Sequence, residues 1–155
     1  MSYVRKARGQ AQLSARLKTV YRSPRRRASA PRVLLIDDDP VIRMLCSANL
    51  QALGIEVLEA GDGSEGFELA RRERPDLVLL DVSMPGLDGF DVARLVRGHR
   101  RTRRIPLMFL SGEKGNDARA RQFGAIACLA KPFDPVALAA LIAATVNRQR
   151  GEVWA

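Results

Sequence analysis

The sequence predicts an α/β fold in which helices cover both faces of a parallel sheet. From residue 33 onward, short apolar runs alternate with segments whose apolar residues recur at helical spacing. This alternation is typical of parallel strands joined by crossover helices. Several of the apolar runs also end in an acid, a serine or a lysine. Ligands of such folds bind at the carboxyl ends of the strands, so the predicted doubly wound sheet of five strands and five helices has a polar edge.

The first predicted strand and helix follow from the residues 33–40. Val33 to Ile36 form an apolar run that ends in three consecutive aspartates. Asp39 followed by Pro40 is a helix-capping residue followed by a proline at the first helical position. We therefore expect a strand over residues 33–36 and a helix that begins after Asp39 and ends before Gly54.

The next strand and helix are marked by a second capping signal. We expect the second strand from Ile55 to Ala60. Asp62 is followed by Glu65 three residues later, which is the spacing of a capping box. The helix that starts there is expected to run to about Arg74.

Asp81 is the most informative residue for predicting the function. It ends the apolar run of residues 77–80 and is followed by Met84, Pro85 and Gly86. A buried strand that ends in a carboxylate and then breaks at proline and glycine places that acid at the mouth of the sheet.

The remainder of the chain repeats the pattern. We expect a helix around Val92–Val96, with His99 partly buried at its end, and then a strand at Pro106–Leu110 that leads to Ser111. A helix at about Asn116–Phe123 and a strand at Ile126–Ala130 that leads to Lys131 follow. The last expected helix begins at Asp134 and Pro135. Two arginine clusters, at residues 71–74 and 100–104, are expected to be solvated helix ends, where the helix dipole favours cations.

The polar residues at these strand ends are of the types that phosphoryl chemistry requires. Asp37, Asp38 and Asp81 would repel one another, so a cation is needed among them. An oxygen-rich pocket of this kind suits Mg²⁺, and Lys131 adds a permanent positive charge. With two cations beside it, Asp81 is a plausible nucleophile toward phosphorus, and the Ser111 hydroxyl is placed to contact the transferred group.

The sequence from residue 33 to about 149 resembles the receiver domain of two-component response regulators. The segments that carry this resemblance are Asp37-Asp38, Asp81 to Gly89, Ser111-Gly112 and Lys131-Pro132-Phe133. The resemblance implies a flavodoxin-like sheet with strand order 2-1-3-4-5, similar to the chemotaxis response regulator. It also implies a histidine kinase or a histidine phosphotransfer protein as the phosphoryl donor.

The resemblance also assigns roles to individual residues. The implied roles are Asp81 as phosphoacceptor, Mg²⁺ binding by Asp37, Asp38, Asp81 and the Ser83 carbonyl, phosphoryl binding by Ser111 and Lys131, and a cis peptide bond before Pro132. Ser83 and Glu113 occupy the variable positions that flank the phosphoryl group. Cys128 departs from the family, which often has Tyr, Phe or His at this position, and a thiol is too small to act as the same switch.

Charge divides the chain into two parts. Residues 1–32 hold ten of the 26 Lys and Arg residues and none of the 17 Asp and Glu residues. We therefore expect a basic, flexible extension at residues 1–31, a receiver domain at 32–150 and a short tail at 151–155. An alternative function follows from this extension, which is that of a DNA-binding regulator whose basic arm neutralises phosphates.

Other properties limit the function classes. No apolar run approaches the roughly 20 residues of a membrane span, so a cytoplasmic protein is expected. Cys46 and Cys128 lie in apolar runs and are expected to be reduced core thiols. The short tail predicts a stand-alone receiver that catalyses only its own phosphorylation and dephosphorylation and whose output is binding to a protein partner. A metal-dependent phosphohydrolase is disfavoured because Asp81 stands apart from Asp37 and Asp38 in the sequence.

Overall fold

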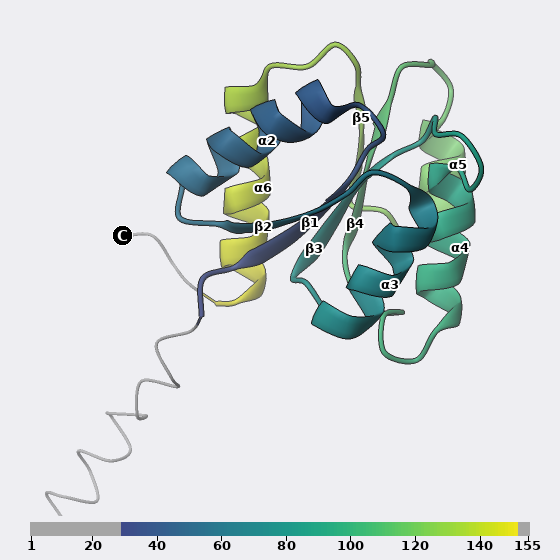
Figure 1. The fold of residues 1–155 in the computed structure, drawn as a ribbon, viewed down its shortest axis with the longest axis horizontal. Helices are drawn as coiled ribbons and strands as arrows, with labels where there is room; N and C mark the ends of the chain where they lie inside the picture. The colour runs from purple at the N-terminus through teal and green to yellow at the C-terminus, as the bar shows by residue number, and fades with distance from the viewer. Residues whose placement is uncertain (1–28, 152–155) are drawn as a thin grey trace, which may run out of the picture.

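The computed structural model describes residues 29–151 and shows the predicted doubly wound sheet (Figure 1). The five strands are β1 (Arg32–Ile36), β2 (Glu56–Ala60), β3 (Leu77–Asp81), β4 (Leu107–Ser111) and β5 (Ala127–Ala130). All neighbouring strands are parallel, and their order across the sheet is β2-β1-β3-β4-β5. The predicted fold class and strand order are confirmed.

Five helices cover the two faces of this sheet. They are α2 (Pro40–Ala52), α3 (Gly63–Glu73), α4 (Gly89–Gly98), α5 (Asp117–Gln122) and α6 (Pro135–Gln149). Helices α2 and α6 pack on one face with a core that includes Leu50 and Ile142. Helices α3, α4 and α5 pack on the other face around Phe90 and Phe109. No helix among the residues that the structure describes is long and apolar enough to cross a bilayer.

The helices begin where the capping residues predict. The Asp39 side chain accepts a hydrogen bond from the Val41 amide, with Pro40 in the first turn. Asp62 caps α3 by accepting from the Glu65 amide. Helix α4 has a full capping box between Asp88 and Asp91, which the sequence analysis did not identify.

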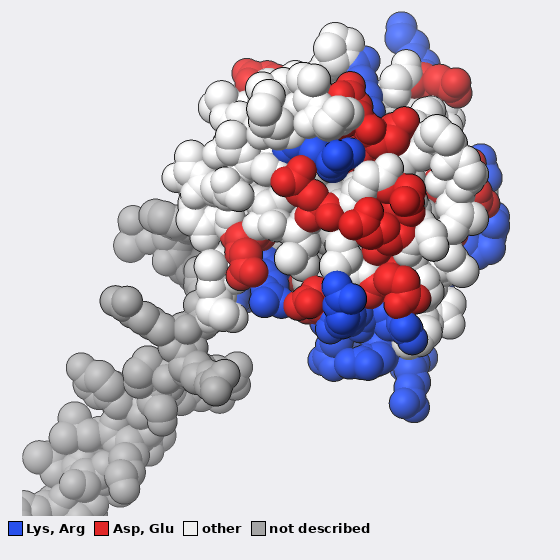
Figure 2. Space-filling view, viewed as in Figure 1, with Lys and Arg blue, Asp and Glu red and all other residues white. Residues whose placement is uncertain are grey.

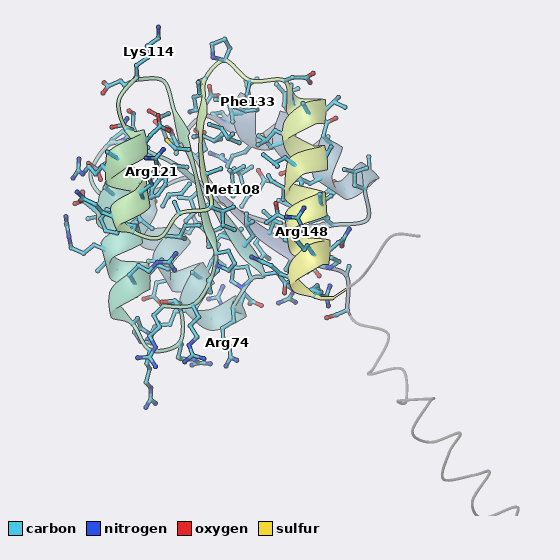
Figure 3. All side chains as sticks on the ribbon, turned by 180° about the vertical axis from the view of Figure 1, so that it is seen from behind. Arg74, Met108, Lys114, Arg121, Phe133 and Arg148 are labelled. Carbon is cyan, nitrogen blue, oxygen red and sulfur yellow. The ribbon has the colours of Figure 1, made fainter. Side chains whose placement is uncertain are left out.

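The strands β3 and β4 are the buried centre of the molecule. Every residue of both strands is buried, including the polar residues Asp81 and Ser111 with which they end. In the sequence, a strand with both faces covered is a continuous apolar run and not an alternation of apolar and polar residues. This burial fixes the position of the strand ends and of the polar edge; Figure 3 shows Met108 of β4 in the interior of the molecule.

The structure differs from the sequence-based expectations in several smaller details. Strand β2 begins at Glu56 rather than Ile55, and β4 includes Ser111. Cys46 is a buried thiol as expected, but Cys128 is only half-buried. His99 is half-buried at the end of α4, where its ring meets the edge of Phe67. The expected basic extension lies, apart from its last residues, outside the described part of the chain.

Candidate functional site

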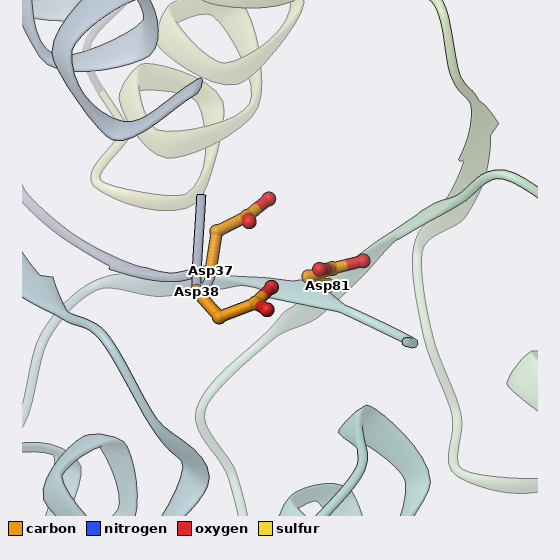
Figure 4. A group of neighbouring side chains, drawn as sticks. All are labelled: Asp37, Asp38 and Asp81. Atoms are coloured by element: carbon orange, nitrogen blue, oxygen red, sulfur yellow. The ribbon is translucent and has the colours of Figure 1, made fainter. Parts of the chain in front are cut away.

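Three carboxylates meet at the carboxyl edge of the sheet. Asp37 and Asp38 directly follow β1, and Asp81 is the last residue of β3. Because Ile36 pairs with Leu80 in neighbouring strands, the two strand ends lie side by side. One oxygen from each of the three carboxylates lies within 4.8 Å of the others (Figure 4). Asp37 and Asp81 are buried, whereas Asp38 is exposed.

Lys131 joins the two buried carboxylates. It follows β5, and its Nζ lies 3.1 Å from Oδ2 of Asp37 and 3.0 Å from Oδ1 of Asp81. Burial by itself would lower the pKa of Lys131. The hydrogen bond to Asp81 and the charges of Asp37 and Asp81 outweigh burial and raise the pKa. The ammonium group therefore stays charged and offsets part of the repulsion between the acids.

The Asp81 carboxyl group has a raised pKa. Burial raises its pKa to about 6, and the negative charge of Asp37 acts in the same direction. The hydrogen bond from Lys131 and the hydrogen bond from the Ser83 amide to Oδ1, at 3.2 Å, act against this rise. Both contacts are made to Oδ1. Within the described residues, Oδ2 has no hydrogen-bond partner of its own.

The chemistry of this group of side chains fits a hard divalent cation. Carboxylate oxygens are the ligands that Mg²⁺ prefers, and Mg²⁺ usually binds through one or two carboxylates together with water. Asp37 is held in place because one of its oxygens accepts the Asp39 amide at 2.9 Å. Asp38 is exposed, so the group is open to solvent on one side. Three acids against one lysine leave a net negative charge that a divalent cation would balance.

Ser111 lies at the end of β4 but is held by its own loop. Its hydroxyl donates to the Glu113 carbonyl at 2.9 Å and accepts from the Glu113 amide at 3.2 Å. The side-chain amide of Asn116 donates to the same oxygen at 2.7 Å. The structure thus brings Asp37, Asp38, Asp81 and Lys131 together, whereas the Ser111 hydroxyl is engaged elsewhere.

Two small grooves flank the Ser111 loop. One of about 390 Å³ lies between Ser83 and Asn116 and opens beside the strand end of Asp81. The other, of about 380 Å³, is lined by Ser111, Cys128 and Lys131. Burial raises the pKa of the Cys128 thiol, and the charge of Asp117 acts in the same direction. Glu113 borders both grooves, so a change in this loop alters both at once.

Two residues that shape the site were missed by sequence reasoning. Asn116 holds the Ser111 hydroxyl, and this side chain consequently makes no capping bond to α5. Gly89 lies against the end of β3, where a Cβ atom would come within 2.3 Å of the Asp81 carbonyl oxygen. The only signal for Gly89 was its place at the end of a turn-rich segment. Asn116 was expected only as the start of a helix, and nothing in the sequence indicated its bond to Ser111.

Comparisons with known proteins agree with this arrangement. Residues 33–143 match the model of the response regulator receiver domain. The chain is 40% identical over 120 residues to the DNA-binding dual master transcriptional regulator RpaA of Synechocystis, covering 76% of this chain and 50% of the relative. It is 41% identical over 127 residues to the transcriptional regulatory protein PdtaR of Mycobacterium tuberculosis, covering 79% and 60%. The chain therefore spans about half the length of the curated relatives it matches.

Solved structures give the same result. A chemotaxis response regulator of Vibrio cholerae has a TM-score of 0.69 at 32% identity, over 76% of this chain and 98% of that one. A CheY-like receiver domain protein of Methanospirillum hungatei has a TM-score of 0.72 at 26% identity, over 81% and 100%. Together with the buried acids and the lysine at the carboxyl edge, these matches show that the chain belongs to the receiver domain family of response regulators.

Proposed function

We propose that Asp81 accepts a phosphoryl group from a histidine kinase or from a histidine phosphotransfer protein. The observation that supports this most is the bridge that Lys131 makes between buried Asp81 and buried Asp37. A buried carboxylate is costly, and a structural role alone does not require two of them beside an exposed third. Membership of the receiver family adds a donor of the right kind, because these domains work with histidine kinases.

The residues of the site have distinct tasks in the transfer. An oxygen of Asp81 attacks phosphorus, the new P–O bond forms, and the bond to the donor's imidazole nitrogen breaks. Oδ2 is the oxygen of Asp81 without a hydrogen bond among the described residues, whereas Oδ1 is held by Ser83 and Lys131. Lys131 supplies a positive charge beside the transferring group. This charge stabilises the negative charge that the phosphoryl oxygens carry in the transition state.

Asp37 and Asp38, together with Asp81 and the Ser83 carbonyl, are the proposed ligands of Mg²⁺. When bound, the ion neutralises charge on the phosphoryl oxygens and so lowers the barrier to transfer. The backbone amide of Asp39 keeps Asp37 oriented for this role.

The Ser111 loop is the proposed reader of the phosphorylated state. A phosphoryl group on Asp81 would offer new acceptor oxygens to a hydroxyl that now donates to the Glu113 carbonyl. Exchange of that hydrogen bond would displace the loop and change the two grooves beside it. Only contacts that differ between the two states shift a conformational equilibrium. Cys128 has no aromatic ring to carry the change, so the loop and α5 are the proposed signalling elements.

The output that we propose is binding to a partner protein that depends on the phosphorylated state. A second candidate output is DNA binding, because RpaA is described as a DNA-binding regulator. In that case the basic residues 1–32 are the proposed contact with phosphates. Retention of DNA in a gel by the full chain and by a chain that begins at Pro31 separates these outputs. Equal weak retention by both would eliminate the basic arm as the DNA contact.

Phosphorylation can be tested directly with a small acyl-phosphate donor and Mg²⁺, followed by intact mass measurement. We expect one phosphoryl adduct on the wild type and none on Asp81→Asn. Asp117→Asn, at an exposed carboxyl group on α5, is the matched control and retains the adduct. An equal adduct on the Asp81→Asn variant would remove Asp81 from its proposed role. Omission of Mg²⁺ should abolish the adduct on the wild type.

A further inference from the structure

A basic groove lies at the end of the sheet opposite to the three acids. It has a volume of about 670 Å³ and is formed by the loop after α3 and the loop after α4. Its charged lining consists of Arg74, Arg100, Arg101, Arg103, Arg104 and Asp76. Figure 2 shows Lys and Arg side chains gathered at this end of the molecule, below the acidic residues. Figure 3 places Arg74 and Lys114 at opposite ends.

The arginines of this groove differ from several others on the described body in having no acidic partner. Arg71 pairs with Glu68 and Arg94 pairs with Asp91, each within its own helix. None of the five groove arginines forms an ion pair with any residue between 29 and 151. Asp76 is the one acid in the lining, and its Oδ2 already accepts the Arg32 amide at 2.8 Å. The groove therefore has a large excess of positive charge.

The helix dipole does not account for most of these arginines. Helix α4 ends at Gly98, and its dipole acts only within the last turn. The arginines of the segment 100–104 are exposed next to this helix end, as expected, but the segment lies beyond the last turn of α4. Arg74 differs from them because it is the C-cap of α3, in the left-handed conformation with φ of 48°, where the dipole of α3 favours a cation.

The backbone of the arginine-rich loop is held firmly. The buried Thr102 hydroxyl donates to the Val96 carbonyl at 2.7 Å. Arg97, which is not part of the groove, donates to the carbonyl groups of Arg103 and Ile105 at 2.9 and 2.6 Å. These bonds fix the loop while the side chains of the groove arginines remain exposed. Like charges are thus held close together before any ligand arrives.

The basic segment at the start of the chain joins the body at the same end. The Asp76 amide donates to the Arg32 carbonyl at 2.9 Å, so the first strand begins next to the groove lining. Arg150 also contacts this region, where it donates to the Ser29 carbonyl at 2.7 Å. Residues 1–32 carry ten cationic side chains and no acid. The described end of the basic segment, residues 29–32, therefore lies at the same end of the molecule as the groove.

We propose that this groove binds the phosphate backbone of a nucleic acid without reading its base sequence. Guanidinium groups bind phosphate through paired hydrogen bonds, and here the loop after α4 supplies four of them and the loop after α3 supplies one. The described lining of the groove contains none of the exposed large apolar side chains that would insert into a bilayer, which favours a nucleic acid over a lipid surface. Binding here does not require phosphorylation of Asp81.

The test compares two variants of the full chain that have the same net charge. The groove variant is R101Q/R103Q/R104Q, and the control K114Q/R121Q/R148Q removes three exposed charges elsewhere. Binding of a labelled duplex and a labelled single strand is measured by fluorescence anisotropy at several salt concentrations. We expect the groove variant to bind roughly tenfold or more weakly, with a salt slope shallower by about 2 to 3. The control should change affinity by about twofold at most.

Other outcomes would overturn the proposal. Equal weakening of the groove variant and the control would show that net charge alone determines binding. A loss of binding in R25Q/R26Q/R27Q with none in the groove variant would assign binding to the arm. Groove-dependent binding to anionic vesicles, without binding to either oligonucleotide, would identify a membrane surface instead. Thermal melting and phosphorylation of Asp81 check that the variants fold, and the milder pair R100Q/R101Q serves if the triple variant does not.

Discussion

The two sides of the carboxyl edge are built in different ways. On the acidic side, Lys131 forms ion pairs with Asp37 and Asp81, and these three residues come from distant parts of the sequence. On the hydroxyl side, Ser111 is bonded to Glu113 and Asn116 within its own loop. The acidic side can exist only when the whole sheet has formed, whereas the hydroxyl side closes locally. The first is therefore suited to hold reactive groups in fixed positions, and the second to rearrange.

The largest effect is expected from removal of the cation on the acidic side. Lys131→Met leaves two buried carboxylates without their shared partner. Breaking a buried ion pair in this way costs about 3 kcal/mol, so the free energy of unfolding in the presence of a chelator should fall by that amount. Chemical denaturation measures the change.

Mg²⁺ sharpens this test because it supplies a replacement cation. Addition of Mg²⁺ should stabilise Lys131→Met more than it stabilises the wild type. Lys114→Met, at an exposed lysine in the Ser111 loop, is the control and should change stability by less than about 0.5 kcal/mol. Similar losses in the two variants would contradict the described role of Lys131.

The second effect is a pH dependence that belongs to the acidic side alone. The pKa of Asp81 is raised to about 6, so the folded protein holds this proton more tightly than the unfolded chain does. Its contribution to stability is therefore present at low pH and is lost as the pH rises through about 6. The stability of Asp81→Asn relative to the wild type should increase by about 2–3 kcal/mol between about pH 4 and pH 7 in chelator. A constant difference over this range would contradict the assignment.

The same contrast explains how much the sequence predicted. Strand ends, caps and the polar edge depend on local patterns, so Asp39, Asp62 and Asp81 could be placed from the sequence alone. The convergence of Asp37 and Lys131 followed from parallel pairing, which makes all carboxyl ends meet at one edge. The cis peptide bond before Pro132 followed from the family resemblance.

Side-chain choices within loops could not be predicted. Asn116 can cap a helix or bond to a neighbouring hydroxyl, and only the folded loop determines which bond forms. The position of the arginines relative to α4 depended on where that helix ends. The helix ends near His99, as expected, but only the folded structure shows that the loop at 100–104 lies beside the loop at 74–76 and forms a groove with it.

The third effect compares the backbone on the two sides. A Cβ atom at Gly89 would lie 2.3 Å from the Asp81 carbonyl oxygen, whereas nothing lies within 4 Å of one at Gly112. Gly89→Ala should therefore cost about 2 kcal/mol and slow phosphorylation, because the end of β3 must move. Gly112→Ala, the matched control beside Ser111, should change stability by no more than about 0.5 kcal/mol. Equal effects would show that the acidic side is not the more tightly packed of the two.

The smallest effect is expected on the hydroxyl side. Asn116→Ala removes the 2.7 Å hydrogen bond to Ser111 and should cost about 1 kcal/mol, whereas Ser111→Ala also removes the two bonds to Glu113 and should cost about 1–2 kcal/mol.

The double variant tests whether these two residues act together. It should cost less than the sum of the single variants, because the bond can be lost only once. All three variants should still be phosphorylated on Asp81, since the acidic side is intact. Hydrogen exchange of the amides between 112 and 116 should change on phosphorylation of the wild type and not of Ser111→Ala. An unchanged exchange pattern in the wild type would mean that the loop does not read the state of Asp81.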